Sequence, residues 1–505
     1  MSTNKSRTHA FLANSFWSMA LMAVTTIVGF IVPRAIIACY GSSINGLVNS
    51  LTQLVSYISL VEAGIGAAAV FALYGPLAKG DQEAVDAIVT EAKKFYYRSG
   101  VIFTVLIFVL AVGYPLVVDV PSLSAFDISI IVVSLGATGF LDFFTLAKYQ
   151  VLLTASQQNW VVQIASIVYK LIYTFIVLAM TYIEAPVVWV YACAVGAIVI
   201  RSLILLCFTR RAFPHVNFSS KTKYKLDQHW DAFYLQILGA VQSGGPVLIA
   251  TFLLKDLRIV SVYSVYMLIA NGVQNLGFSF SNGTQASFGD VIARGEISSL
   301  QRAFSEFQTS VYSLNGVLCG VAAALIVPFV SIYTSGVSDA DYARPLLGVL
   351  VILNVLLYHL KSPQGLLVIA AGHYRQTRLQ TSIQTAILLF GGIVLGYFFG
   401  IEGIVSAACL SNLYRDIDLM FYVPNKITHT DPFDTLKKML ASCFVAALVA
   451  IPYMAIGPTC DSWLSWFVQA IVLCVWGVLV AFGVCYATQR VELIGLLRRL
   501  HFIKG

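Results

Sequence analysis

The residues most able to do chemistry are ionisable side chains that lie inside long apolar runs. Lys170 stands nine residues into the run at 161–181, about 13 Å from its start if the run is helical. Lys361 stands late in the run at 346–371 and is followed by Ser362 and Pro363, where a kink is expected. A charge inside hydrocarbon costs about 2.5–3.5 kcal/mol on insertion scales, so each such residue is a functional candidate.

Three basic residues could line a cavity, and two acids could accompany them. Arg34, Lys170 and Lys361 suit an anionic substrate, because arginine binds phosphate through two parallel hydrogen bonds and lysine acts as a point charge. The alternative is that they form intramembrane ion pairs or extend to the lipid surface. Glu62 and Asp142 could pair with these cations at rest or carry a coupling H⁺ or Na⁺. The sequence leaves both alternatives open.

Other polar residues in the apolar runs have a simpler interpretation available. Lys148 and Arg201 lie nearer the ends of their runs, where extension toward the lipid headgroups explains them. Neutral amides that could bind a sugar, or could equally join neighbouring helices, are Asn49, Gln53, Gln242, Asn271 and Gln274.

The elements that must position these residues are membrane-spanning helices. The chain has 505 residues, of which 58% are hydrophobic and 11% are charged, too apolar a composition for a wetted surface. Runs long enough to cross about 30 Å of hydrocarbon lie at 12–38, 46–74, 99–118, 128–153, 161–181, 187–208, 232–254, 260–282, 310–333, 346–371, 380–399, 401–422, 437–457 and 463–487. We predict an all-α integral membrane protein with about fourteen spans.

The charged loops between the runs alternate in sign. The net charge of +7 is spread over short basic clusters between runs, which excludes a basic nucleic-acid-binding domain. With the N-terminus inside, the basic loops fall on one side; the loop after the twelfth run is assigned Arg415, Lys426, Lys437 and Lys438. The opposite loops hold mostly acids. Both termini are therefore predicted to be cytoplasmic.

A repeat is visible within the chain. Ala78-Lys79-Gly80-Asp81 after the second run matches Ala293-Arg294-Gly295-Glu296 after the eighth at an offset of 215. The end of the fourth run, 154–159, matches 370–375 at an offset of 216, and Gly100 then matches Gly316. An even number of crossings makes the two copies parallel.

The repeat predicts the domain organisation. Residues 1–208 and 232–422 form two six-helix lobes, joined by a basic, amphipathic cytoplasmic linker at 209–231. Residues 423–505 add two further spans and a cytoplasmic tail. No ATP-binding, hydrolase or metal-ligand motif is present, so we expect a secondary transport process without cofactor or metal, and not an enzyme.

Several segments resemble the Wzx-type polysaccharide flippases. They are Pro33-Arg34, Tyr40-Gly41, 44–47, 62–66, 153–159 and 262–265. The resemblance covers the first twelve spans. It implies membership of a superfamily that also contains the multidrug (MATE) exporters and the lipid II flippase MurJ. It implies MATE-like lobes and movement of undecaprenyl-diphosphate-linked repeat units by alternating access, from the inner to the outer leaflet of the bacterial cytoplasmic membrane, for surface or capsular polysaccharide. It implies membrane lipid, a polysaccharide polymerase and a chain-length regulator as partners.

The resemblance also bears on the choice between related functions. Arg34 occupies the position of a cavity arginine in the MurJ pattern, where it is implicated in pyrophosphate binding. The second and eighth spans lack the other arginines of that pattern, which favours a repeat-unit flippase over a lipid II flippase. A cation-coupled multidrug exporter and a membrane glycosyltransferase or ligase remain alternatives, although such transferases carry larger outer loops.

Overall fold

The computed structural model describes residues 2–62, 65–220, 222, 224, 230–281, 284–457 and 460–499, and helices are the only regular elements in these ranges. Twelve of the described helices are long and apolar enough to cross a membrane. The runs predicted on either side of Gly400 form one helix, in which Gly400 adopts φ 63° and ψ −141°. The run predicted at 46–74 is divided among several helices. The apolar part at its end, Ala68–Lys79, is shorter than the helices that could cross a membrane. The predicted all-helical membrane fold is confirmed.

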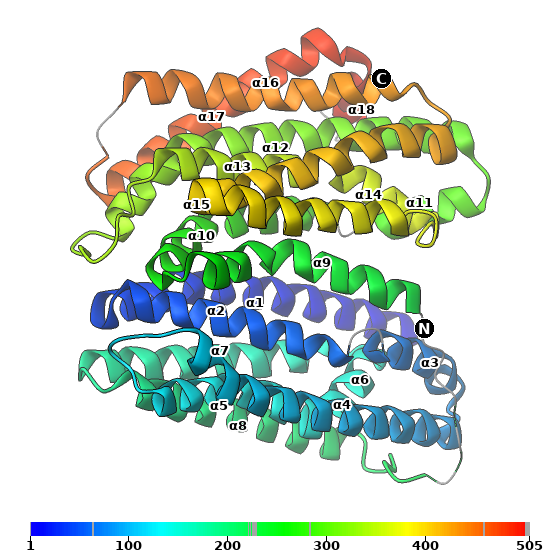
Figure 1. The fold of residues 1–505 in the computed structure, drawn as a ribbon. Helices are drawn as coiled ribbons and strands as arrows, with labels where there is room; N and C mark the ends of the chain where they lie inside the picture. The colour runs from blue at the N-terminus through cyan, green and yellow to red at the C-terminus, as the bar shows by residue number, and fades with distance from the viewer. Residues whose placement is uncertain are drawn as a thin grey trace. The chain divides into compact units, whose positions relative to one another are not determined.

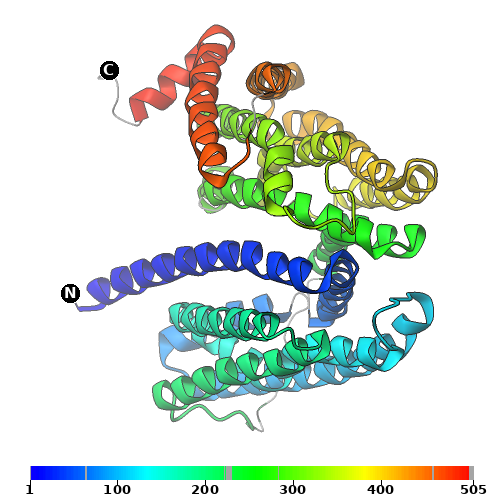
Figure 2. The same cartoon turned by 90° about the vertical axis from the view of Figure 1, so that its left-hand side faces the viewer.

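The chain divides into two compact units, Met1–Ile237 and Leu238–Gly505. The helices of the first unit are α1 (Ser2–Tyr40), α2 (Ser42–Ile58), η1 (Ser59–Glu62), α3 (Ile65–Lys79), α4 (Gln82–Val117), α5 (Ala125–Leu141), η2 (Asp142–Leu146), α6 (Ala147–Ala155), α7 (Asn159–Tyr182) and α8 (Val187–Ala212). Within it α1 packs along α7, α7 along α8, and α4 along α5 (Figure 1). Figure 2 shows α1, in dark blue, as one long helix.

The second unit begins within α9. Its elements are α9 (Trp230–Ile249), η3 (Ala250–Leu254), α10 (Leu257–Ser281), α11 (Gln285–Ala293), α12 (Ile297–Tyr333), α13 (Pro345–Leu360), α14 (Ser362–Ala370), α15 (Arg378–Val423), η4 (Pro424–Thr428), α16 (Pro432–Ile456), α17 (Trp463–Thr488) and α18 (Arg490–Arg499). Here α12 is the central helix, packed against α10, α13, α16 and α17. The exact limits predicted for lobes, linker and appendage stay a prediction.

The described part of the predicted linker is attached to the first unit. Residues 213–220 carry no helix and run against α4. The backbone N–H of Asn217 donates to Asp86 Oδ1 at 3.0 Å, and Lys93 Nζ donates to the carbonyl of Phe218 at 3.2 Å. Side chains of α4 thus satisfy backbone groups of an irregular segment. Most of 221–229 lies outside the described residues.

The repeat is present in the backbone turns of both units. Gly80 and Gly295 both adopt φ 70°, the left-handed conformation that ends a helix and favours glycine. Asp81 and Glu296 follow as N-caps of α4 and α12, and each backbone N–H donates to the carbonyl five residues before it, at 3.0 and 3.2 Å. The offset of 215 is confirmed at this turn.

The turn after the fourth crossing corrects the second offset. Gln157 (φ 62°) and Gly372 (φ 71°) occupy the same left-handed position, again 215 residues apart. The residue after each donates to the carbonyl five residues before it, at 2.8 and 3.0 Å. The predicted offset of 216 is therefore wrong by one residue, and Gly100 and Gly316 are not equivalent. The offset of 216 came from aligning residues of similar size and polarity. The hydrogen bonds that end each helix instead define the true register between the two copies.

The last two spans cover α12 through glycines. A Cβ on Gly316 would lie 2.8 Å from the carbonyl oxygen of Ser442, and one on Gly320 would lie 2.9 Å from that of Ala446, both on α16. Small residues let membrane helices approach closely enough to pack without a hydrophobic driving force. This coverage is why 67% of the apolar window of α12 is buried, against 28% for α4 in the first unit.

Replacing Gly320 should loosen this contact. In Gly320→Leu the new side chain meets the α16 backbone, and we expect a loss of about 1–3 kcal/mol of stability, as for other overpacked cores. Thermal unfolding of the purified protein in detergent measures it. Gly483→Leu on α17 is the matched control, because nothing lies within 4 Å of its Cβ position. Equal destabilisation by both variants would contradict the packing role.

The C-terminal helix α18 packs against α12 and α17, and its Glu492 carboxylate adds polar contacts with α12 and α16. Ser305 Oγ donates to Glu492 Oε1 at 2.9 Å, and Lys438 Nζ lies 3.5 Å from the same oxygen. Burial acts to raise the pKa of Glu492, but hydrogen bonds from its own backbone, from Ser305 and from Lys438, together with the lysine charge, outweigh it and leave that pKa below its ordinary value.

This contact should weaken in acid. A carboxylate whose pKa is depressed by folding stabilises the folded state above its unfolded pKa and loses that effect as the pH falls through the folded pKa. Glu492→Gln should therefore cost up to about 1 kcal/mol at pH 7 and progressively less below the ordinary pKa of glutamate. Thermal unfolding of both proteins between pH 7 and pH 3 tests this. A difference that does not change with pH would refute it.

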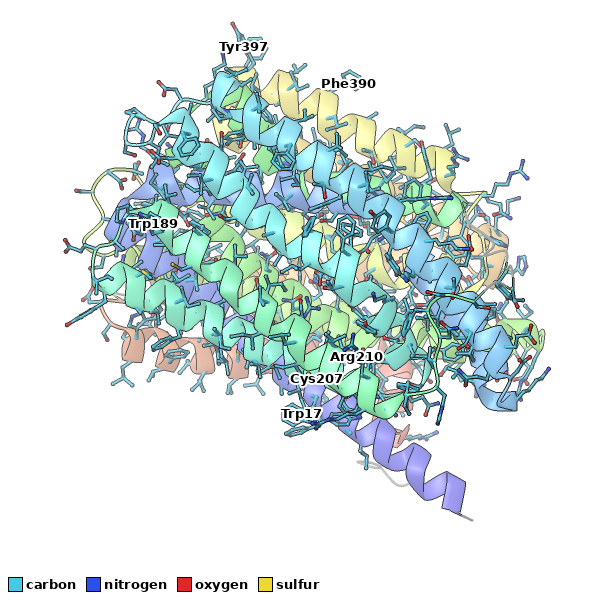
Figure 3. The ribbon with its side chains drawn as sticks, turned by 90° about the horizontal axis from the view of Figure 1, so that it is seen from below. Trp17, Trp189, Cys207, Arg210, Phe390 and Tyr397 are labelled. Atoms are coloured by element: carbon cyan, nitrogen blue, oxygen red, sulfur yellow. The ribbon has the colours of Figure 1, made fainter. Side chains whose placement is uncertain are left out.

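The outer helix faces carry large apolar side chains. Phe390 and Tyr397 on α15 are 70% and 76% exposed and point away from their helix in Figure 3. Trp189 and Arg210 lie at opposite ends of α8 in the same view. An exposed apolar face with an aromatic residue at one end and arginine at the other is typical of a helix in lipid.

Candidate functional site

The first unit contains a pocket of about 600 Å³ among its helices. Its lining residues are Ser56, Ser59, Leu60, Glu62, Gly66, Val70, Tyr96, Asp142, Ala147, Gln150, Val151, Thr154, Arg201 and Gln236. Two irregular segments shape it: the 3₁₀ turn η1 ends at Glu62, and the π-helix η2 begins at Asp142. Such π-helical turns often occur at functional sites, because the extra residue displaces a side chain from the regular helix face.

An ion pair crosses this pocket. Arg201 Nη1, from α8, donates to Asp142 Oδ1 at 2.8 Å, and the two side chains are 12% and 39% exposed. This differs from the interpretation of Arg201 as a side chain that extends to the headgroups. The arginine instead turns inward, because a carboxylate one helix away is a better partner than distant water.

Glu62 and Tyr96 lie beside the ion pair. Glu62 is close enough to Asp142 for their charges to repel each other, and it also acts on Tyr96. A Cβ on Gly66 would lie 2.9 Å from the Tyr96 hydroxyl, so the glycine lets that hydroxyl approach α3. The two acids predicted for coupling are thus brought together at one site.

The other polar residues predicted in the first unit lie on separate helices. Lys170 is on α7, partly buried and within electrostatic range of Arg201. Arg34 is on α1 and partly buried. Asn49 and Gln53 are on α2, where Asn49 Nδ2 donates to the carbonyl of Asn45 at 2.8 Å. None of these four lines the pocket.

Lys148 is placed differently from Arg201. Its ammonium lies 5.0 Å from the ring centre of Tyr149 and 5.8 Å from that of Phe218. It contacts aromatic faces of its own unit near the cytoplasmic end predicted for α6, where cation–π contacts are favourable. It does not line the pocket.

The second unit contains its own polar cluster around Lys361. The expected helix break is present: α13 ends at Leu360 and α14 begins at Ser362, so Lys361 stands at the junction. Its Nζ donates to Asn412 Oδ1 at 2.6 Å and lies 4.8 Å from the ring centre of Tyr358. Gln384 Nε2 donates to the same oxygen at 3.1 Å.

Charges on α15 near this cluster were not recognised from the sequence. Asp416 is 3% exposed, neither of its carboxylate oxygens has a hydrogen-bond partner among the described residues, and it acts electrostatically on Lys361. Arg415, assigned to a loop, is buried within α15 and lies 2.5 Å from Asp418. Lys438, assigned to the same loop, is buried in α16. The rule applied to Lys361 would have found Asp416, because it too stands inside an apolar run.

The amides predicted in the second unit are dispersed. Gln242 Nε2 donates to Thr385 Oγ1 at 3.2 Å, which is the helix-joining role left open by the sequence. Asn271 is exposed and Gln274 partly buried on α10.

Comparisons with known proteins bear on the fold. No protein-family model matches the sequence, and no curated protein matches it. A solved structure of an inward-facing MATE multidrug resistance transporter of the MOP superfamily is 11% identical, with a TM-score of 0.67 over 80% of this chain and 95% of that one. The lipid II flippase MurJ, in an inward closed conformation, is 12% identical, with a TM-score of 0.66 over 94% of this chain and 99% of that one. A MOP superfamily transporter from Pyrococcus furiosus reaches a TM-score of 0.51 at 13% identity over 83% and 95%.

These similarities define the class of fold. The chain has the helical fold of the MATE and MurJ transporters of the MOP superfamily. The MurJ structure matches 94% of this chain, and residues 423–505 make up more of the chain than the part left unmatched. The MurJ structure therefore has counterparts for part of the last two spans.

The cluster around Asn412 should contribute to stability. Asn412→Leu removes the acceptor of Lys361 and Gln384 and the donor to Asn354 Oδ1, a bond of 2.8 Å. Leaving buried polar groups unpaired costs about 1–3 kcal/mol each, so a clear fall in the thermal unfolding temperature in detergent is expected. Asn271→Leu, at an exposed position, is the control and should change it little. A fall of the same size in both variants would disprove the role of the cluster.

Proposed function

We propose that this protein is a flippase that moves oligosaccharide repeat units, linked to a polyprenyl lipid through a diphosphate, from the inner to the outer leaflet of the bacterial cytoplasmic membrane. The observation that carries the proposal is the presence of basic side chains inside both helical units, Lys170 and Arg201 in the first and Lys361 in the second. Basic groups held away from bulk water suit a diphosphate.

The lipid II flippase supports a lipid-linked substrate over a small soluble one. Its structure matches 94% of this chain, including part of the last two spans, whereas the multidrug transporter with the similar TM-score matches 80%. The Wzx-like segments of the first twelve spans favour repeat units of a surface or capsular polysaccharide. In this proposal the lipid is undecaprenyl, translocation proceeds by alternating access, and a polymerase and a chain-length regulator act on the product outside.

A second function is favoured by a specific observation. The pocket of the first unit holds two carboxylates, Glu62 and Asp142, for one arginine. Acids inside a membrane bundle also suit a cation-coupled exporter of cationic drugs. We rank this function second, because Arg201 neutralises one of the two acids and Lys170 lies near it.

A genetic test separates the two functions. Deletion of the gene from its bacterium should abolish the surface polysaccharide and accumulate the lipid-linked unit on the cytoplasmic side. Complementation by Arg201→Ala or Lys361→Ala should restore less than about a tenth of the polymer, if each lost charge contact contributes 1.4 kcal/mol or more. Surface polymer and radiolabelled lipid-linked units are measured.

The control and the opposing outcomes are equally defined. Arg211→Ala removes an exposed arginine at the end of α8 and should complement fully. Normal surface polymer in the deletion strain would refute the flippase, and increased sensitivity to cationic drugs would then identify an exporter. Arrest of cell-wall synthesis in the deletion strain would instead point to lipid II as the substrate.

A further inference from the structure

In the first-unit pocket, Asp142 is already paired with Arg201, the basic group that an anionic substrate would need. Arg201 gives Nη1 to Asp142, and its Nε is buried without a hydrogen-bond partner among the described residues. Asp142 lines the pocket, and its side chain is 39% exposed. An incoming anion therefore competes with Asp142 for Arg201 Nη1.

The surroundings of Asp142 decide what displacement would do. The charged and titratable groups that act on it directly are Glu62 from η1, Tyr169 from α7 and Arg201 from α8. Tyr96 from α4 lies beside Glu62, and Lys170 from α7 lies within electrostatic range of Arg201. Within the part of the chain that the structure describes, Arg201 is the group that bonds to the carboxylate directly. If another anion binds Arg201 in its place, Asp142 loses its partner and lies near Glu62 and the charges of the bound anion.

Two carboxylates close together in a confined pocket repel each other once their cation is taken away, which favours protonation of one of them. We propose that a diphosphate displaces Asp142 from Arg201, and that the displaced Asp142, next to Glu62, takes up one proton from water. The carboxylate becomes a carboxylic acid, the diphosphate keeps its charge, and the proton returns to water when the substrate leaves. This inference rests on the proposed function and adds its coupling.

The geometry favours a diphosphate diester over a single phosphate or a drug cation. A guanidinium presents several N–H groups in a planar fork and can bond two anionic oxygens at once. A pocket of about 600 Å³ is of the size that encloses a ligand with a diphosphate and attached sugar, since ligand pockets span about 300–1,000 Å³. A cation would meet Arg201 as a repulsive group.

Proton uptake would couple transport to pH. By linkage, an anion that binds together with a proton binds more tightly as the pH falls, and the proton binds more tightly when the anion is present. Because the proton would travel with the substrate from the inner to the outer leaflet, acidification of the cytoplasm should favour translocation and acidification of the outside should oppose it. Glu62 and Asp142 together supply the coupling role that the sequence suggested for each.

The test uses the full-length protein in lipid nanodiscs and symmetric dimethyl diphosphate, a soluble diester whose two charges persist from pH 5 to pH 8. Calorimetric titration in two buffers of different ionisation enthalpy counts the protons exchanged. We expect uptake approaching one proton per anion at neutral pH, and affinity that rises by up to about tenfold per pH unit on acidification.

Variants assign the effect to named groups. Asp142→Asn removes the competitor, so the anion should bind roughly tenfold tighter, with little proton uptake and a flat pH profile. Arg201→Gln should abolish binding. Glu402→Gln is the matched control, because it breaks an ion pair of 3.2 Å with Arg344 outside this pocket, and binding should be unchanged.

The opposing outcomes are separate from failure of the proposed function. Binding by the wild type without proton uptake, or weaker binding by Asp142→Asn, would overturn the coupling. If that variant does not fold, the proton count on the wild type still decides. Absence of any binding would overturn the assignment of this pocket, whereas the polysaccharide phenotype decides the flippase function independently.

Discussion

Hydrocarbon offers no hydrogen-bond partners, so a charge in the interior of this protein is stabilised by polar groups on neighbouring helices. Arg201 finds Asp142 across the first-unit pocket, and Lys361 finds Asn412 within the second unit. Both partnerships occur at interruptions of regular helix, the π-helix that begins at Asp142 and the junction between α13 and α14. The irregular backbone aims polar side chains inward, where a straight helix would present some of them to lipid.

The same constraint explains how the two units diverge from a common pattern. Their turns match at Gly80 and Gly295, and at Gln157 and Gly372, because a left-handed residue is needed where each helix ends. Their surroundings differ because α16 and α17 cover α12, and no equivalent pair follows α8 in the first unit. The central helix of the second unit thus becomes a packed core element, while α4 keeps a large apolar face exposed.

The charge balance of the first-unit pocket changes how its residues are understood. A purely cationic cavity would bind an anion and hold it, since nothing inside would compete. Asp142 and Arg201 pair their opposite charges at that point, and Glu62 lies beside them as a second carboxyl group. Such a site can exchange one partner for another, as the proposed function requires.

The sequence alone was sufficient for the membrane class, the approximate number of spans and the internal repeat. Length and apolar composition dictate helices in lipid, and isolated charges such as Lys361 stand out against that background. It could not assign Arg201, because depth along one helix does not reveal that a carboxylate on another helix lies 2.8 Å away. Nor could it find the register of 215 at Gln157 or the burial of Asp416, which depend on backbone bonds and on packing between helices far apart in the chain. Partner choice in a low-dielectric interior is a property of three-dimensional proximity, and only the tertiary structure decides it.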